Sequence, residues 1–245
     1  MSDEFYSEPE LYDLMFTPGE HAPFYAGEAR RAGGPVLELA CGTGQLLEPI
    51  ARGGQSVVGL DLAAPMLEVA RERLRGAPAE LVEGDMRHFE LARSFSMVFI
   101  ARNSLLHLHA TDDLLACFHS VRRHLEPDGV FVFDVFNPSV HLLARPAGKR
   151  FRMMEVRHPT RGEVTVEAES AYDAAAQVAR GTWYFSAPGA PDFWTAPLEM
   201  RSIFPQEIPL LLAAGGFRLE ARHGDLSGAP FYGGSPRQIC VCRPA

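Results

Sequence analysis

The residues best suited to chemistry lie in the segment VLELACGTG, which runs from Val36 to Gly44. Its apolar positions predict a short strand buried on both faces, and Glu38 places a carboxyl group within that strand. Gly42 and Gly44 then permit a tight turn and a close approach of the backbone to a ligand. Residues 45–52 are predicted to form a helix whose first amide hydrogens and positive dipole end face the turn. This combination indicates a nucleotide-like ligand.

A second carboxylate narrows the class of ligand. Asp61 ends the predicted strand 57–61, where a carboxylate can accept hydrogen bonds from both hydroxyls of a ribose. In the dinucleotide-binding turn G-x-G-x-x-G, the third glycine lets the helix pack closely around a pyrophosphate. Leu47 occupies that third position here. The pattern therefore favours a ribose-bearing ligand without a pyrophosphate over the alternative of an NAD-dependent oxidoreductase.

The elements that must position these groups alternate between strands and helices from Val36 to about Asn137. Such alternation predicts an open, doubly wound α/β sheet covered by helices. The expected strands are 36–39, 57–61, 79–85, 96–101 and 130–136, and the expected helices are 45–52, 65–75 and 112–125. The segment Glu126-Pro-Asp-Gly129 predicts a turn before the last of these strands.

The pattern changes after Asn137, where strands follow one another without intervening helices. Four strands are expected at residues 151–159, 163–172, 178–186 and 194–204, and such a series predicts an antiparallel sheet. A helix at 205–214 and strands at 217–223 and 238–242 follow. We therefore expect a core made of residues 1–137 and 205–245, with an antiparallel β insertion at residues 138–204.

Composition excludes several classes of function. The formal net charge is −8 and no block rich in lysine or arginine occurs, so we expect no nucleic-acid partner. The four cysteines lack C-x-x-C spacing, and we expect buried thiols in a reducing cytoplasm. No export signal or apolar span is present, so we expect no membrane partner. We expect no metal site, because Glu163, Glu167 and Glu169 fit the solvated face of an amphipathic strand.

Four motifs in succession resemble those of the class I S-adenosylmethionine-dependent methyltransferases. They are Glu38 to Gly44 (ELACGTG), Val57 to Asp61 followed by Pro65-Met66, Glu83 to Met86 (EGDM), and the turn and strand from Glu126 to Phe136. They lie in the family's order over about a hundred residues. The resemblance implies a Rossmann-like, seven-stranded methyltransferase sheet and S-adenosyl-L-methionine as the cofactor.

The resemblance also implies which residues hold that cofactor. The backbone from Ala40 through Cys41 and Gly42 to Gly44 would cradle its methionine part, and Glu38 either contributes there or braces the turn. Asp61 would hold the ribose hydroxyls. The remaining cofactor-binding positions are Leu62 and Met66 beside the adenine, Gly84, Asp85 and Met86 on its polar edge, and Arg102, Asn103 and Ser104 near the sulfonium. Met66 is equally compatible with a place in the hydrophobic core.

Three residues are candidates for contact with the methyl acceptor. In similar small-molecule members, an N-terminal segment, here residues 1–30, forms a lid whose tyrosines touch the substrate or the sulfonium, and Tyr12 is our candidate. Tyr232 lies on a C-terminal loop expected at the same pocket, and His107 follows the expected Asn103-Ser104 loop. Packing of an N-terminal helix is the alternative role for any single tyrosine. A solvent-facing or structural role is the alternative for the histidine.

The insertion resembles that of small-molecule N-methyltransferases acting on amino sugars or glycine-like amines, where it covers the substrate pocket and can build dimers. We therefore expect methyl transfer by in-line displacement to a small-molecule amine, by a monomer or homodimer. A neutral amine attacks without strong base assistance, whereas a hydroxyl requires a general base. O-methylation, with His107 as the base, and a non-catalytic cofactor-binding protein that acts through its insertion are the alternatives.

Overall fold

The computed structural model describes residues 3–245 and divides the chain into two units. The larger unit comprises residues 18–137 and 203–245, and the smaller comprises residues up to Thr17 together with residues 138–202. The expected N-terminal lid therefore contributes to both units. Its first two residues, Met1 and Ser2, lie outside the described residues.

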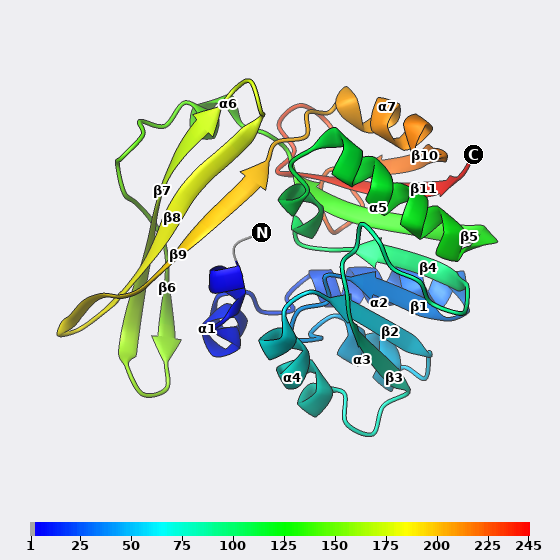
Figure 1. The fold of residues 1–245 in the computed structure, drawn as a ribbon, viewed down its shortest axis with the longest axis horizontal. Coiled ribbons are helices and arrows are strands. Elements are labelled where there is room, and N and C mark those ends of the chain that lie inside the picture. The colour runs from blue at the N-terminus through cyan, green and yellow to red at the C-terminus, as the bar shows by residue number, and fades with distance from the viewer. Residues whose placement is uncertain (1–2) are drawn as a thin grey trace. The chain divides into compact units, whose positions relative to one another are not determined.

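A seven-stranded sheet forms the centre of the larger unit (Figure 1). In spatial order its strands are β10 (Phe217–His223), β11 (Arg237–Pro244), β5 (Leu125–Phe136), β4 (Phe95–Ile100), β1 (Val36–Leu39), β2 (Val57–Asp61) and β3 (Ala79–Glu83). β1 to β5 are parallel, whereas β11 runs antiparallel to both β5 and β10. The doubly wound, Rossmann-like sheet expected from the sequence is confirmed.

Helices cover both faces of this sheet. They are α2 (His21–Ala32), α3 (Leu47–Arg52), α4 (Ala64–Arg73), α5 (Thr111–His124) and α7 (Glu207–Ala214). Residues of α2, α3 and α4 share one apolar cluster with Val132 of β5. Phe131, the preceding residue, packs edge-on against Phe118 of α5 at a ring-centroid distance of 5.6 Å. Because successive strand residues point to opposite faces, the two helix groups bury the two sides of the sheet.

The turn predicted at Glu126–Gly129 does not precede β5 but lies within it. Phe95 of β4 pairs with Leu125, and two residues later Met97 pairs with Val130. Residues 126–129 therefore form a bulge on β5, where the chain departs from the ladder and rejoins it. The predicted start of the strand was wrong, because Leu125 already pairs with β4 before the bulge.

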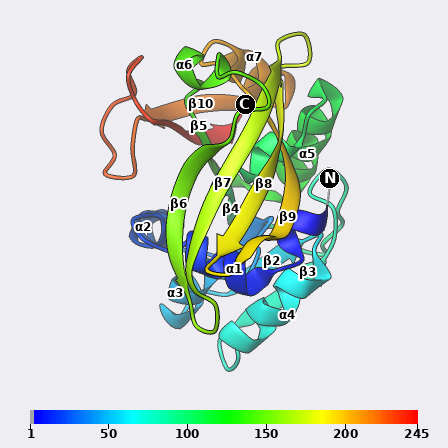
Figure 2. The same ribbon diagram turned by 90° about the vertical axis from the view of Figure 1, so that its left-hand side faces the viewer.

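The smaller unit contains a four-stranded antiparallel sheet, which Figure 2 shows face-on. Its strands are β6 (Phe151–His158), β7 (Gly162–Asp173), β8 (Val178–Ala187) and β9 (Ala190–Arg201), in that spatial order, and a short helix α6 (Val140–Leu143) precedes them. The 3₁₀ helix η1 (Asp3–Tyr6) and α1 (Pro9–Met15) pack on this sheet. Phe5 and Leu11 share its apolar cluster with Val164, Val166 and Phe185.

Both ends of the insertion are anchored in the core beside β11. The backbone amide of Asn137 donates to the carbonyl oxygen of Pro236 at 3.0 Å. The side-chain amide of Gln238 donates to the carbonyl oxygen of Ile203, also at 3.0 Å. The chain thus leaves the core and returns to it at neighbouring residues of one segment.

Three further observations concern membrane-spanning helices, metal sites and cysteines. No helix among residues 3–245 is long and apolar enough to cross a membrane. Within the same range, no group of three or more histidine, cysteine, aspartate or glutamate residues is arranged to hold a metal ion. All four cysteines are buried and carry free thiols.

Candidate active site

The turn after β1 has an unusual backbone. Ala40, Gly42 and Gly44 all have positive φ angles, of 55°, 54° and 75°. A β-carbon on Gly44 would lie 3.3 Å from side-chain carbons of both Ala70 and Leu74, so this turn also packs closely against α4 and the residue that follows it. The left-handed torsion and the close contact together require glycine at position 44. The turn therefore presents its backbone, rather than side chains, at the end of β1.

Asp61 joins the turns that follow β1, β2 and β3. Its Oδ2 accepts a hydrogen bond from the Gly42 amide at 2.7 Å, and its Oδ1 accepts one from the Ala63 amide at 2.8 Å. Its backbone carbonyl accepts a hydrogen bond from Gly84 at 2.9 Å. Burial raises the pKa of Asp61, and the amide hydrogen bonds partly oppose that shift. The Leu62 amide also contributes to this effect. Since each carboxylate oxygen has two acceptor positions, Asp61 still retains acceptor capacity toward a ribose.

Glu38 places a buried carboxyl group near Asp61. The residue is 3% exposed, and its Oε2 atom has no hydrogen-bond partner among residues 3–245. Burial raises the pKa of Glu38 well above its usual range, the charge of Arg102 opposes the shift, and the charge of Asp61 adds to it. A buried carboxylate without a donor is costly. The site therefore fits a ligand that brings a cationic donor, as the ammonium group of S-adenosylmethionine would.

A strained turn follows β4. Arg102 and Asn103 have φ angles of 55° and 67°, which is costly for residues with a β-carbon, at roughly 1 to 3 kcal/mol each. Asn103 Oδ1 accepts a hydrogen bond from the Phe136 amide at 2.7 Å. Arg102 Nη1 donates to Gln45 Oε1 at 2.9 Å, and this contact ties the turn to the segment after β1. The 3₁₀ helix η2 (Ser104–His107) begins directly afterwards.

Asp134 of β5 holds the strained turn from within the core. This carboxylate is fully buried and accepts hydrogen bonds from the Tyr25 hydroxyl at 2.6 Å, the Arg102 amide at 2.9 Å and Arg237 Nη1 at 2.7 Å. His21 Nε2 lies 3.7 Å from its Oδ2 atom. Sequence reasoning missed Asp134. The sequence does indicate this residue, because a charged side chain within the apolar run VFVFDVF needs buried partners.

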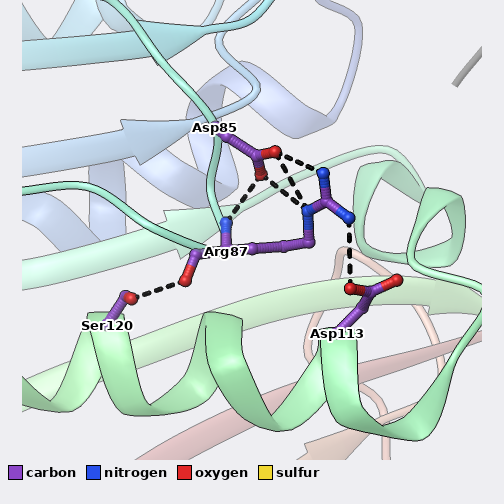
Figure 3. Close-up of polar contacts among 4 residues, drawn as sticks. All are labelled: Asp85, Arg87, Asp113 and Ser120. Atoms are coloured by element: carbon purple, nitrogen blue, oxygen red, sulfur yellow. Dashed lines mark hydrogen bonds and ion pairs between the residues drawn. The ribbon is translucent and has the colours of Figure 1, made fainter.

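The structure places the expected adenine-side residues in different environments. Met66 and Met86 are buried, at 1% and 5% exposure, whereas Leu62 is 40% exposed. The carboxylate of Asp85 is engaged by Arg87, a residue that sequence reasoning did not single out (Figure 3). For Met66, this burial favours a role in the core beneath α4 over direct contact with a ligand.

The three candidates for the acceptor side do not lie in one unit. His107 and Tyr232 belong to the larger unit and Tyr12 to the smaller. Tyr12 packs near Tyr6 and Phe16, at centroid distances of 6.0 and 4.9 Å, within the apolar cluster of the smaller unit. His107 is half-buried in η2, and Tyr232 is 68% exposed. Their roles remain predictions.

Comparisons with known proteins find similar methyltransferases. Residues 36–129 match the family model described as a methyltransferase domain. The chain is 26% identical to the cypemycin N-terminal methyltransferase of a Streptomyces species over 95% of this chain and 94% of the relative. It is 41% identical to the dTDP-3-amino-3,6-dideoxy-alpha-D-glucopyranose N,N-dimethyltransferase of Streptomyces fradiae over 51% of this chain and 45% of the relative. That match spans just under half of the amino-sugar enzyme.

A solved structure extends the similarity over nearly the whole chain. The CcbJ methyltransferase from Streptomyces caelestis superposes with a TM-score of 0.80 at 28% identity, covering 93% of this chain and 97% of that one. The fold, the site and these matches agree. Together they support a class I S-adenosylmethionine-dependent methyltransferase, with S-adenosyl-L-methionine as its cofactor.

The raised pKa values of Glu38 and Asp61 predict that cofactor binding depends on pH. The ionised carboxylates attract a cationic ligand, so affinity should increase as the pH rises through their raised pKa values. For one linked proton the increase approaches about tenfold per pH unit. Calorimetry in two buffers with different ionisation enthalpies should detect proton release on binding. Glu38→Gln should reduce that release, and equal release by the variant and the wild type would contradict the assignment.

Proposed function

We propose that this protein transfers a methyl group from S-adenosylmethionine to the nitrogen of a small-molecule amine. The observation that carries the proposal is the buried Glu38 carboxyl group, whose Oε2 atom meets no hydrogen-bond partner within residues 3–245, beside Asp61 and the left-handed turn after β1. Two relatives, an N-terminal methyltransferase and an amino-sugar N,N-dimethyltransferase, support an amine as the acceptor.

Each part of the cofactor site has a proposed role. The backbone from Ala40 to Gly44 and the Glu38 carboxylate hold the methionine end, and Asp61 accepts from the ribose hydroxyls. Asp85 and the amide of Met86 bind the polar edge of the adenine, beside Leu62 and Gly84. Arg102, Asn103 and Ser104 border the sulfonium end. When bound, the cofactor supplies an activated methyl group, and these residues fix its position for in-line displacement.

The acceptor is held by residues that orient it rather than by a strong base. Tyr12 and Tyr232 offer aromatic faces that attract cations, at about 0.5 to 2 kcal/mol each. His107 contacts the acceptor and orients its nitrogen, and a neutral amine attacks without first losing a proton to a base. The insertion, residues 138–204, contributes substrate specificity.

The proposal includes the protein's setting. We propose a monomer or homodimer in the cytoplasm that acts on a small molecule and not on nucleic acid. Support comes from a formal net charge of −8 and from four buried free thiols, which suit a reducing compartment.

The test uses methyl-labelled S-adenosylmethionine with separate pools of amines, amino sugars, simple sugars and phenols. We expect label on nitrogen in an amine-containing pool, and label only on oxygen would contradict the proposal. His107→Ala should lower kcat by less than about tenfold, because an amine lone pair attacks without strong base assistance. A hydroxyl acceptor would lose about 100-fold or more. Cofactor binding without any labelled product would instead indicate a non-catalytic binding protein.

A further inference from the structure

The guanidinium group of Arg87 bridges two carboxylates from different elements (Figure 3). Arg87 Nε lies 3.0 Å from both oxygens of Asp85, and Nη2 lies 2.6 Å from Oδ2. On its other side, Nη1 lies 3.1 Å from Oδ1 of Asp113, in the first turn of α5. The three side chains are only 24% to 36% exposed, so this is a partly shielded, two-sided ion pair.

The same segment is fastened to α5 at two further places. Ser120 Oγ donates to the carbonyl oxygen of Arg87 at 2.8 Å, and the amide of Leu91 donates to His124 Nε2 at 2.9 Å. Asp113, Ser120 and His124 are seven and then four residues apart, which places them on one face of the helix. α5 therefore anchors the segment from Asp85 to Leu91 along almost its whole length.

The hydrogen bonds at Asp85 show how many acceptor positions its carboxylate still has for a ligand. A carboxylate has about four acceptor positions. The backbone amide of Arg87, 2.9 Å from Oδ1, takes one, and the Nε and Nη2 hydrogens take two more. One position remains for an additional donor. Hydrogen bonding from Arg87 is also the main reason that the pKa of Asp85 is lowered, so the carboxylate stays ionised and acts only as an acceptor.

We propose that Arg87 is a positioning residue for adenine recognition: braced by Asp113, it holds Asp85 in one orientation with one acceptor position open to the 6-amino group. This inference rests on the proposed function, in which Asp85 faces the adenine. It assigns the discrimination between a 6-amino and a 6-carbonyl purine to an arginine that does not itself contact the base.

The test compares two ligands by calorimetry. They are S-adenosylhomocysteine and its inosine analogue, in which a carbonyl oxygen replaces the 6-amino group. The wild type should prefer the adenine ligand by about 100-fold or more, because a carbonyl oxygen would face an ionised carboxylate. Arg87→Gln should reduce that ratio to below about tenfold, mainly by weakening the adenine ligand. Arg87→Lys should be intermediate, since lysine keeps the charge but loses the planar fork.

Controls separate this role from a structural one. Arg75→Gln removes an exposed arginine that pairs with Glu72, and it should leave the ratio unchanged. Asp113→Asn keeps the Arg87–Asp85 contact but removes the charge that braces Arg87, so the ratio should fall by a few fold. If Arg87→Gln weakened both ligands equally, Arg87 would be merely structural and the proposal would be overturned. A wild type that binds both ligands equally would overturn it too, whereas one that binds neither would refute the proposed function itself.

Discussion

Asp61→Ala is expected to weaken the binding of S-adenosylmethionine by at least about 100-fold. In the proposed site the carboxylate accepts from two ribose hydroxyls, and a hydrogen bond to a charged group contributes about 1.5 to 3 kcal/mol. The substitution also removes the acceptor for the Gly42 and Ala63 amides, so the turn that holds the methionine end loses its hydrogen bond to the Asp61 side chain at the end of β2. Isothermal calorimetry with S-adenosylmethionine and S-adenosylhomocysteine measures the loss.

Glu83→Ala is the matched control for Asp61→Ala. Glu83 pairs in register with Asp61 on the neighbouring strand β3, yet it is exposed. Its removal changes the local charge by the same amount without touching the turn after β1. Affinity within about threefold of the wild type is expected for this control. If both variants bound the cofactor equally well, the assignment of Asp61 to the ribose would be wrong.

Asp134→Asn is expected to destabilise the core by about 3 to 5 kcal/mol, the usual effect of breaking a buried, hydrogen-bonded charge pair. The amide cannot accept from Tyr25, Arg102 and Arg237 at once, and it removes the charge that faces Arg237. A shift of roughly 10 °C in melting temperature follows for a chain of this size. Asp128→Asn, which changes an exposed carboxylate on the same strand, should leave the melting temperature nearly unchanged.

The choice of probe matters for Asp134→Asn. Both tryptophans, Trp183 and Trp194, belong to the smaller unit, so their fluorescence does not report on the core. Hydrogen exchange of the β4 and β5 amides reports on the core directly, and it should accelerate in the variant. Unchanged exchange would show that Asp134 does not hold this part of the sheet.

The effect of Asp134 should also depend on pH. Burial alone would raise the pKa of Asp134, but the proximity of His21, the charge of Arg237 and the hydrogen bond from Tyr25 lower it overall. The ionised carboxylate therefore stabilises the fold above the ordinary carboxyl range, near pH 4, and this contribution is lost as the pH falls through the lowered value. The difference between Asp134→Asn and the wild type should thus shrink in acid.

The core and the turns that form the candidate cofactor site were predictable because their determinants are local. The strand that contains Glu38, the two glycines of the turn and the acidic end of β2 all lie within short segments whose apolar pattern fixes the element. The antiparallel insertion was predictable for the same reason, since alternating residues such as Val164 and Val166 define one buried face. The boundary of β5 was not, because pairing with Phe95 outweighs the turn preference of Glu126–Gly129.

The remaining parts of the site depend on contacts between distant residues. Asp134 meets Tyr25 and Arg237, which lie 109 and 103 residues away, and no local pattern indicates that meeting. Arg87 stands two residues from Asp85, but the partner that braces it, Asp113, comes from α5. For Met66 the difficulty is different, because helical spacing is the same for a core residue and for one that contacts a ligand.

The anchoring of the insertion at Pro236 and Gln238 has a consequence for how such enzymes diversify. Because the insertion starts and ends beside one segment of the core, its length and sequence can change without altering any strand pairing in the seven-stranded sheet. The insertion can therefore be exchanged as a unit. Replacing the segment between Asn137 and Ile203 with the corresponding segment of a relative offers a route to new methyl acceptors while the cofactor-binding core stays unchanged.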